Sequence, residues 1–256
     1  MGRREHSESL NKSDKSGNQH NLTNPDLREC VNRLLKLSTD SIPLQSNSNT
    51  LLSYHNDLSV IIDKIKLLES QQSDNGSIEY DYDRISNDKL VAFTDWLKSN
   101  GAIFNGCSIA DFPGYDLGLK ADVDVTYGTL FIAVPTKLMM RIESAKKSIL
   151  KNLISKHQIL KDMENVTMAI YLLVEKFKND SFYKPYIDIL PRSYSTVLYF
   201  STEELKELKG SPTLELAVGL IKNICRQYAY FHIMFDHGDD PVSRLLKPHF
   251  TFEEYW

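Results

Sequence analysis

Residues 95–121 read DWLKSNGAIFNGCSIADFPGYDLGLKA, and the change of pattern within this stretch decides the fold. The apolar spacing of a helix ends at Asn100-Gly101, where a glycine follows the last helical residue, as at many helix C-termini. The next segment, 103–112, alternates loosely between apolar and polar residues, which is typical of a strand. Pro113-Gly114 then separates it from a second short segment, 118–121. We therefore expect a helix followed by short strands.

The downstream sequence continues with strands and then becomes helical. Residues 128–135, GTLFIAVP, form a continuous apolar run that ends at a proline, which predicts a buried strand. Residues 138–140 predict one more short strand. From Glu143 onward apolar residues recur at helical spacing, and Ser201-x-x-Glu204 has the form of a capping box at the start of a helix. Short strands followed by a helical block predict an α+β fold.

The upstream sequence predicts helices behind a polar tail. Residues 1–22 are rich in Ser, Asn and Lys without any period, so we interpret them as disordered. Asn24-Pro25 is a helix start signal, and a strong helical period covers residues 51–68. The polar segment 71–84 reads as a linker or exposed loop.

Composition and charge exclude several classes of protein. The chain has 256 residues, 41% hydrophobic and 25% charged, which is ordinary globular composition. Thirty Lys and Arg against thirty-four Asp and Glu give a net charge of −4, so no basic excess attracts the whole chain to nucleic acid or to anionic membranes. The three cysteines are far apart and fit a reducing compartment. We expect a cytoplasmic protein, with the nucleus as a second location, and no nucleic-acid or membrane partners.

Common catalytic and metal-site motifs do not occur in the chain. It contains no GxxxxGK[ST] or GxGxxG phosphate loop, no GxSxG elbow and no HExxH or Cys/His cluster. We therefore predict no metal site, and the motif inventory alone supports only an intracellular α+β protein.

Several longer strings carry a family resemblance. They are 95–121 (quoted above), LFIAVPTKLMMRIESAKKSIL (130–150), SFYKPYIDILPRSYSTVLYF (181–200), CRQYAYF (225–231) and FTFEEYW (250–256). Together they resemble the N-terminal half of the SET-domain protein methyltransferases, the class that includes the Rubisco large-subunit lysine methyltransferase. The SAK-S and RQYAYF strings are most similar to the actin-histidine N-methyltransferases of that class. The resemblance covers roughly residues 85–256.

The resemblance implies an incomplete SET domain with short β-strands, a large helical insertion and an N-terminal helical extension. The implied parts are a disordered tail (1–22), a helical region and linker (23–86), an N-terminal SET segment (87–141) and the helical SET insertion (142–256), with the chain ending before the C-terminal SET half.

The resemblance also implies S-adenosyl-L-methionine as the cofactor, bound against the loop 114–119. Within that loop it assigns Tyr115, Asp116 and Leu117 to cofactor binding, together with Arg84 as a partner for the cofactor carboxylate. Asp116 stands where the family has a glycine, and a glycine would let the backbone approach the ligand closely. This substitution predicts weakened cofactor binding. A simple loop charge is the alternative interpretation of Arg84.

The implied protein substrate is actin, methylated on a histidine, and the implied assembly is a monomer. The resemblance places Asn165 and Arg226 in the substrate groove, where an arginine can pair with an acidic residue of the substrate. A helix-surface amide is the alternative for Asn165. Other possible functions are a lysine methyltransferase of the same fold and a non-catalytic module that binds actin or another protein.

No catalytic residue is assigned, because the family's Asn-His pair and channel tyrosine have no match after residue 200. The aromatic residues crowded at 250–256 allow two interpretations: a tail folded back on the core, or a truncated chain. We expect a truncated and inactive form.

Overall fold

Helices make up most of the described chain, and the strands are short. The computed structural model describes residues 24–40, 47–72, 86–191 and 194–256. In chain order its elements are α1 (Pro25–Thr39), α2 (Ser48–Gln72), α3 (Asn87–Ser99), β1 (Ile103–Phe104), β2 (Cys107–Phe112), β3 (Asp116–Ala121), β4 (Ile132–Ala133), η1 (Thr136–Leu138), α4 (Ile142–Lys147), α5 (Lys151–Lys156), α6 (Gln158–Asp162), α7 (Glu164–Phe177), α8 (Lys184–Ile187), η2 (Val197–Tyr199), α9 (Thr202–Lys206), α10 (Pro212–His237), α11 (Pro241–Leu246) and α12 (Phe252–Tyr255). The α+β prediction is confirmed. The predicted tail 1–22 and most of the predicted linker 71–84 lie outside the described residues.

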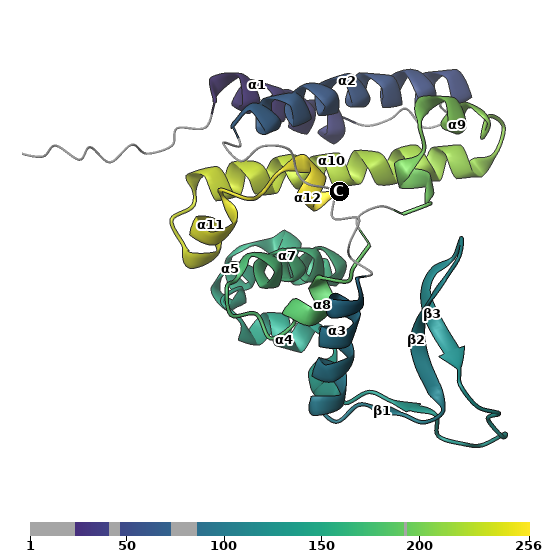
Figure 1. Cartoon of the computed structure of the whole chain (residues 1–256). Helices are drawn as coiled ribbons and strands as arrows, with labels where there is room; N and C mark the ends of the chain where they lie inside the picture. The colour runs from purple at the N-terminus through teal and green to yellow at the C-terminus, as the bar shows by residue number, and fades with distance from the viewer. Residues whose placement is uncertain (1–23, 41–46, 73–85, 192–193) are drawn as a thin grey trace, which may run out of the picture.

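The N-terminal helices α1 and α2 pack against the long helix α10 (Figure 1). As the sequence predicts, α1 starts at Asn24, whose side-chain oxygen accepts a hydrogen bond from the Asp26 amide at 2.9 Å, with Pro25 at the first helical position. A second group of helices, α4 to α8, lies on the other side of α10 (Figure 1). The described helices therefore form two layers around α10.

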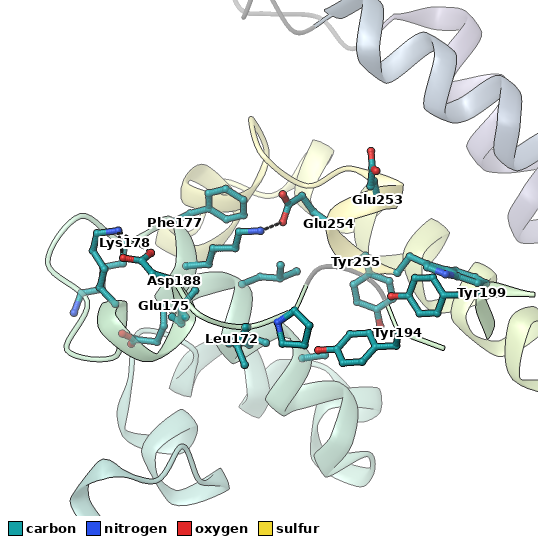
Figure 2. A pocket seen from close by; sticks show the side chains of 18 residues that line it. Leu172, Glu175, Phe177, Lys178, Asp188, Tyr194, Tyr199, Glu253, Glu254 and Tyr255 are labelled. Carbon is teal, nitrogen blue, oxygen red and sulfur yellow. Dashed lines mark hydrogen bonds and ion pairs between the residues drawn. The ribbon is translucent and has the colours of Figure 1, made fainter. Parts of the chain in front are cut away.

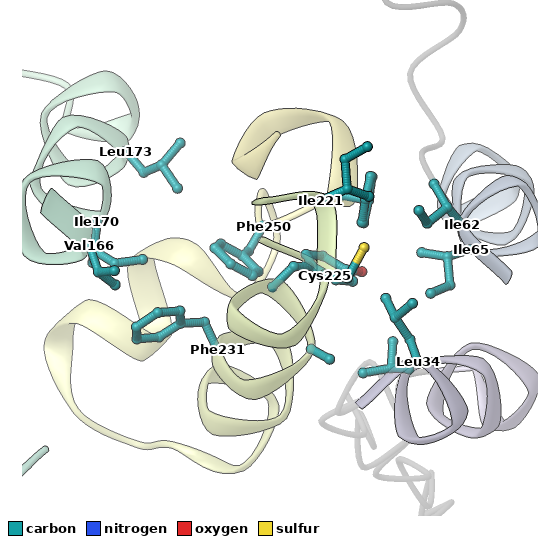
Figure 3. Close-up of a cluster of buried hydrophobic side chains, with 14 of the residues drawn as sticks. Leu34, Ile62, Ile65, Val166, Ile170, Leu173, Ile221, Cys225, Phe231 and Phe250 are labelled. Carbon is teal, nitrogen blue, oxygen red and sulfur yellow. The ribbon is translucent and has the colours of Figure 1, made fainter. Parts of the chain in front are cut away.

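The hydrophobic core extends across both faces of α10. Side chains of α1 and α2 approach one face of it, and side chains of α7 approach the other (Figure 3). Tyr228, Phe231 and Phe235 on α10 are almost completely buried. Because large aromatic side chains remove the most apolar surface from water, these residues carry much of the burial energy of the helical body.

The last residues of the chain fold onto this helical body. Phe250 and Phe252 are buried; the Phe250 ring stacks on Tyr228 of α10, and the Phe252 ring meets Tyr228 edge-on. The Thr251 hydroxyl accepts a hydrogen bond from the Glu254 amide at 3.2 Å, but the Glu254 carboxylate pairs with Lys176 of α7 instead of completing the capping box. The interpretation of a folded-back aromatic tail is therefore confirmed for this segment.

The strands form two separate two-stranded ladders in the described residues. Strand β2 pairs antiparallel with β3, and Ala110 lies opposite Gly118. Strands β1 and β4 pair over two residues each. In Figure 1 the β2–β3 hairpin stands away from the helical layers.

Two strand predictions are wrong. The predicted buried strand 128–135 is extended over only Ile132–Ala133, and its Leu130 and Phe131 side chains are exposed. The predicted strand 138–140 begins as part of the 3₁₀ turn η1, because Pro135 precedes a turn in which the Leu138 amide donates to the Pro135 carbonyl at 2.9 Å. In the described residues the run pairs only with the two-residue strand β1, so the rest of it has no ladder to join.

Candidate functional site

The turn between β2 and β3 places three of the sequence-predicted cofactor residues together. The Tyr115 amide donates to the Phe112 carbonyl at 2.8 Å, which closes the turn around Gly114 at φ +81°. The Tyr115 side chain is 88% exposed, whereas Leu117 is half-buried. The hairpin therefore presents residues 115–117 at one exposed tip.

Asp116 has the backbone conformation of a glycine. Its φ is +67°, and it is the one non-glycine residue with a positive φ in the described ranges. Asp and Asn adopt this left-handed conformation more readily than other side chains, because their short polar groups bond locally. Here the carboxylate Oδ1 accepts a hydrogen bond from the Leu117 amide at 2.9 Å. The backbone at this position is thus the one a glycine would give, with a carboxylate added beside the turn.

Gly118 is constrained by the hairpin itself. A Cβ at this position would lie 3.0 Å from two ring carbons of Phe112, which is tighter than ordinary packing. A larger residue at position 118 would therefore require the Phe112 ring to shift by a few tenths of an ångström.

The predicted substrate residues lie on two different helices. Asn165 is exposed in the first turn of α7, and Arg226 is exposed on α10, where it donates to the Asn223 side chain at 3.0 Å. Burial raises the pKa of Tyr54 to about 12, and the positive charge of Arg226 opposes this shift by lowering that pKa. No hydrogen bond or ion pair joins Asn165 to Arg226 in the described part of the chain. Arg84 lies outside the described residues.

A pocket that the sequence does not reveal lies where α7, α8, the segment after α8 and α12 meet. Its volume is about 480 Å³. Figure 2 shows the Lys176–Glu254 ion pair at one side and the rings of Tyr194, Tyr199 and Tyr255 at one end. Neither Asn165 nor Arg226 lines it. α12 is far in the sequence from α7 and α8, so no local motif contains all the residues that form this pocket.

A second pocket, of about 460 Å³, lies between α5 and the C-terminal end of α10. His157 at its edge has its Nδ1 atom 3.0 Å from the Tyr230 hydroxyl, and His237 has its Nδ1 atom 2.8 Å from the Ile233 carbonyl oxygen. Both histidines are thus fixed by neighbouring groups of the fold.

Glu69 is a buried carboxylate that connects α2 to the C-terminal segment. Its side chain is 7% exposed and accepts hydrogen bonds from the Tyr228 hydroxyl at 2.5 Å and from the Phe252 amide at 3.1 and 3.0 Å. Burial raises the pKa of Glu69 to about 7, although both donors and Lys66 oppose the shift and Glu253 adds to it. Sequence reasoning misses this residue because one glutamate near a helix end carries no signal.

The described residues contain no group of three or more His, Cys, Asp or Glu side chains arranged to hold a metal ion. A helix long and apolar enough to cross a membrane is also not found among them.

No family model matches the chain. Over 189 residues it is 36% identical to the actin-histidine N-methyltransferase of Xenopus tropicalis and 35% identical to that of Gallus gallus. These alignments cover 74% of this chain and 32% of each relative, so the chain spans about a third of the length of the curated relatives it matches.

The fold is similar to that of a solved lysine methyltransferase. A structure of Rubisco LSMT bound to sinefungin and monomethyllysine gives a TM-score of 0.55 at 23% identity, covering 65% of this chain and 38% of that chain. The SET domain of LSMT bound to methyllysine and AdoHcy gives 0.54 at 25% identity, covering 65% and 37%. The chain is thus homologous to the actin-histidine N-methyltransferases over about three quarters of its own length, and it shares its fold with part of the SET domain of Rubisco LSMT.

Proposed function

We propose that this chain supplies the N-terminal SET segment and the helical insertion of an S-adenosyl-L-methionine-dependent methyltransferase that modifies a histidine of actin. The observation that carries the proposal is the homology over 189 residues to relatives named for that reaction. We further propose that the protein acts in the cytoplasm as a monomer, with actin as its partner.

The β2–β3 tip has the features that suit it to hold the cofactor. The turn at Gly114 and the positive φ of Asp116 give the backbone the shape that a glycine-containing loop would have. The Asp116 carboxylate adds a negative charge that such a loop lacks. The backbone shape supports the assignment of this tip to the cofactor, and we expect the Asp116 side chain to weaken cofactor binding.

When bound, S-adenosyl-L-methionine supplies a methyl group on a sulfonium that a neutral imidazole nitrogen can attack. The histidine must be unprotonated to react. The protein therefore has to position the neutral imidazole ring against the methyl group and to exclude the protonated ring. In this proposal Arg226 pairs with an acidic residue of the actin segment, and Asn165 hydrogen-bonds its backbone. Both side chains are exposed and able to reach a partner.

The experiment joins the 256-residue chain to the part of the Xenopus tropicalis relative that lies C-terminal to the match. We expect methylation of an actin histidine, read by mass spectrometry, in this fusion but not in the 256-residue chain, because the chain corresponds to about a third of the relative. In the fusion, Arg226→Ala should raise KM for the actin peptide by about tenfold or more, because its acidic partner is then left unpaired. Asp116→Gly should lower the Kd for the cofactor in calorimetry.

Two outcomes would contradict parts of the proposal. Methylation of lysine instead of histidine would favour the second candidate, a lysine methyltransferase, which the LSMT structures with bound lysine and methyllysine suggest. Actin binding without cofactor binding or turnover in the fusion would favour a non-catalytic module.

A further inference from the structure

The pocket between α7, α8 and α12 has its positive charges already compensated. Three lysines lie in its wall, and each has a carboxylate partner. Lys176 pairs with Glu254, Lys184 with Asp188 at 2.9 Å, and Lys178 with Asp180 at 3.4 Å. An anion entering the pocket would therefore have to break an existing ion pair.

Two carboxylates of the same wall have no ammonium or guanidinium partner in the described residues. Glu175 is buried and accepts a hydrogen bond from the neutral Ser181 hydroxyl at 2.7 Å. Glu253 is exposed at the other side of the pocket and is paired with no described cation. The described lining thus has a surplus of negative charge.

Electron-rich rings form one end of the pocket. The Tyr194 and Tyr199 rings lie 5.9 Å apart, and Trp256 meets Tyr199 edge-on at 6.4 Å. Tyr194 is 49% exposed, so its ring is open to a ligand (Figure 2). The faces of Tyr and Trp rings attract ammonium and guanidinium groups. Leu172, beside the rings, offers an apolar surface to an aliphatic stem.

We propose that this pocket binds the cationic side chain of a lysine or arginine carried by a peptide segment. The charged end group lies against the Tyr194 and Tyr199 rings and is attracted by the exposed Glu253 carboxylate, while the methylene stem lies on Leu172. The proposal concerns a surface separate from the β2–β3 tip, and it does not depend on the methyl-transfer function.

The test uses the 256-residue chain and three short peptides that differ only at the central residue: lysine, trimethyllysine or norleucine. Calorimetry should show that both cationic peptides bind at least about fivefold more tightly than the neutral norleucine peptide, since only they gain the cation–π and charge interactions. Free butylamine should bind more weakly than the lysine peptide if a peptide is the true ligand. Equal affinity for lysine and norleucine peptides, or no binding of any peptide, would overturn the proposal.

Matched variants assign the binding to this pocket. Tyr194→Leu and Glu253→Gln change exposed side chains, so the fold should survive, and each should weaken lysine-peptide binding roughly two- to fivefold. Tyr194→Phe keeps the ring and should bind like the unchanged protein. Glu29→Gln makes the same change of charge at an exposed position of α1 and should have no effect. If neither Tyr194→Leu nor Glu253→Gln alters the affinity, the peptide binds elsewhere and the assignment is wrong.

Discussion

The helical body and the strand region from β1 to β4 belong to one chain, yet they bury their apolar side chains to very different extents. Phe231 of α10 is fully buried between two helical layers, whereas Phe131, just before β4, is 46% exposed. A helix satisfies its own backbone hydrogen bonds and needs only a partner for its apolar stripe. A strand also needs neighbouring strands, and two-stranded ladders are only marginally stable. The difference teaches that the apolar content of a segment does not decide whether it is buried.

The largest expected effect separates these two regions directly. Phe231→Ala should lower the free energy of unfolding by about 3–5 kcal/mol, because it removes a buried ring and leaves a cavity. Phe131→Ala should change it by less than about 0.5 kcal/mol, as expected for an exposed residue. Urea unfolding followed by circular dichroism measures both. A large loss for Phe131→Ala would mean that the strands contribute to the same cooperative core.

The second prediction concerns pH and the buried Glu69. Its folded-state pKa is raised to about 7, so the folded protein holds a proton that the unfolded chain releases above its ordinary value of 4.5. The stability that this proton provides is fully present below pH 4.5 and is lost as pH rises towards 7, by on the order of 3 kcal/mol. His232, with its pKa lowered to about 4 by burial, acts in the opposite direction between pH 4 and 6.5.

The variant Glu69→Gln isolates the contribution of this carboxylate. Relative to the unchanged protein, we expect it to gain stability as pH rises from 5 to 8, because only the unchanged protein loses the Glu69 contribution. Unfolding curves at several pH values measure the difference, and Glu29→Gln on exposed α1 serves as the control. A difference between Glu69→Gln and the unchanged protein that does not vary with pH would show that Glu69 does not titrate in this range.

The smallest expected effect lies in the hairpin. Asp116→Ala should destabilise the turn by about 1 kcal/mol, because alanine disfavours a positive φ and cannot accept the hydrogen bond from the Leu117 amide. Asp116→Gly should be within about 0.5 kcal/mol of the unchanged protein, since a glycine adopts this φ freely. Hydrogen exchange of the β2 and β3 amides measures local opening. Equal exchange in both variants would remove the conformational argument at Asp116.

Local signals predict helix ends well in this chain. Capping depends on a few neighbouring residues, so a local pattern can reveal it. The observed N-termini of α1 and α9 lie at Asn24-Pro25 and at the Ser201 capping box, and the C-terminus of α3 lies just before Gly101. The run 128–135 misleads because strand formation depends on a partner strand, which a local pattern does not contain. The hairpin tip 115–117 could be assigned only through the family resemblance.

Contacts between distant segments are the part that sequence reasoning could not supply. Glu69 looks like an ordinary polar residue near a helix end, and only the packing of α2 against α10 and α12 makes it buried. The pocket lined by Lys176, Tyr194 and Trp256 likewise exists only after three segments meet. Neither feature has a motif, because each is set by tertiary packing.

The hydrogen bonds between Glu69 and the Phe252 amide also constrain how the chain is made. The two residues are 183 positions apart, so Glu69 leaves the ribosome well before the amide that it caps has been synthesised. At synthesis rates of 5–20 residues per second this interval is roughly 10–40 seconds. Until the end of this interval α12 is missing, so the Glu69 carboxylate lacks the Phe252 amide as a hydrogen-bond donor. Closure of this part of the fold therefore cannot precede the synthesis of Phe252, and the raised pKa of Glu69 couples it to proton uptake by a nascent chain.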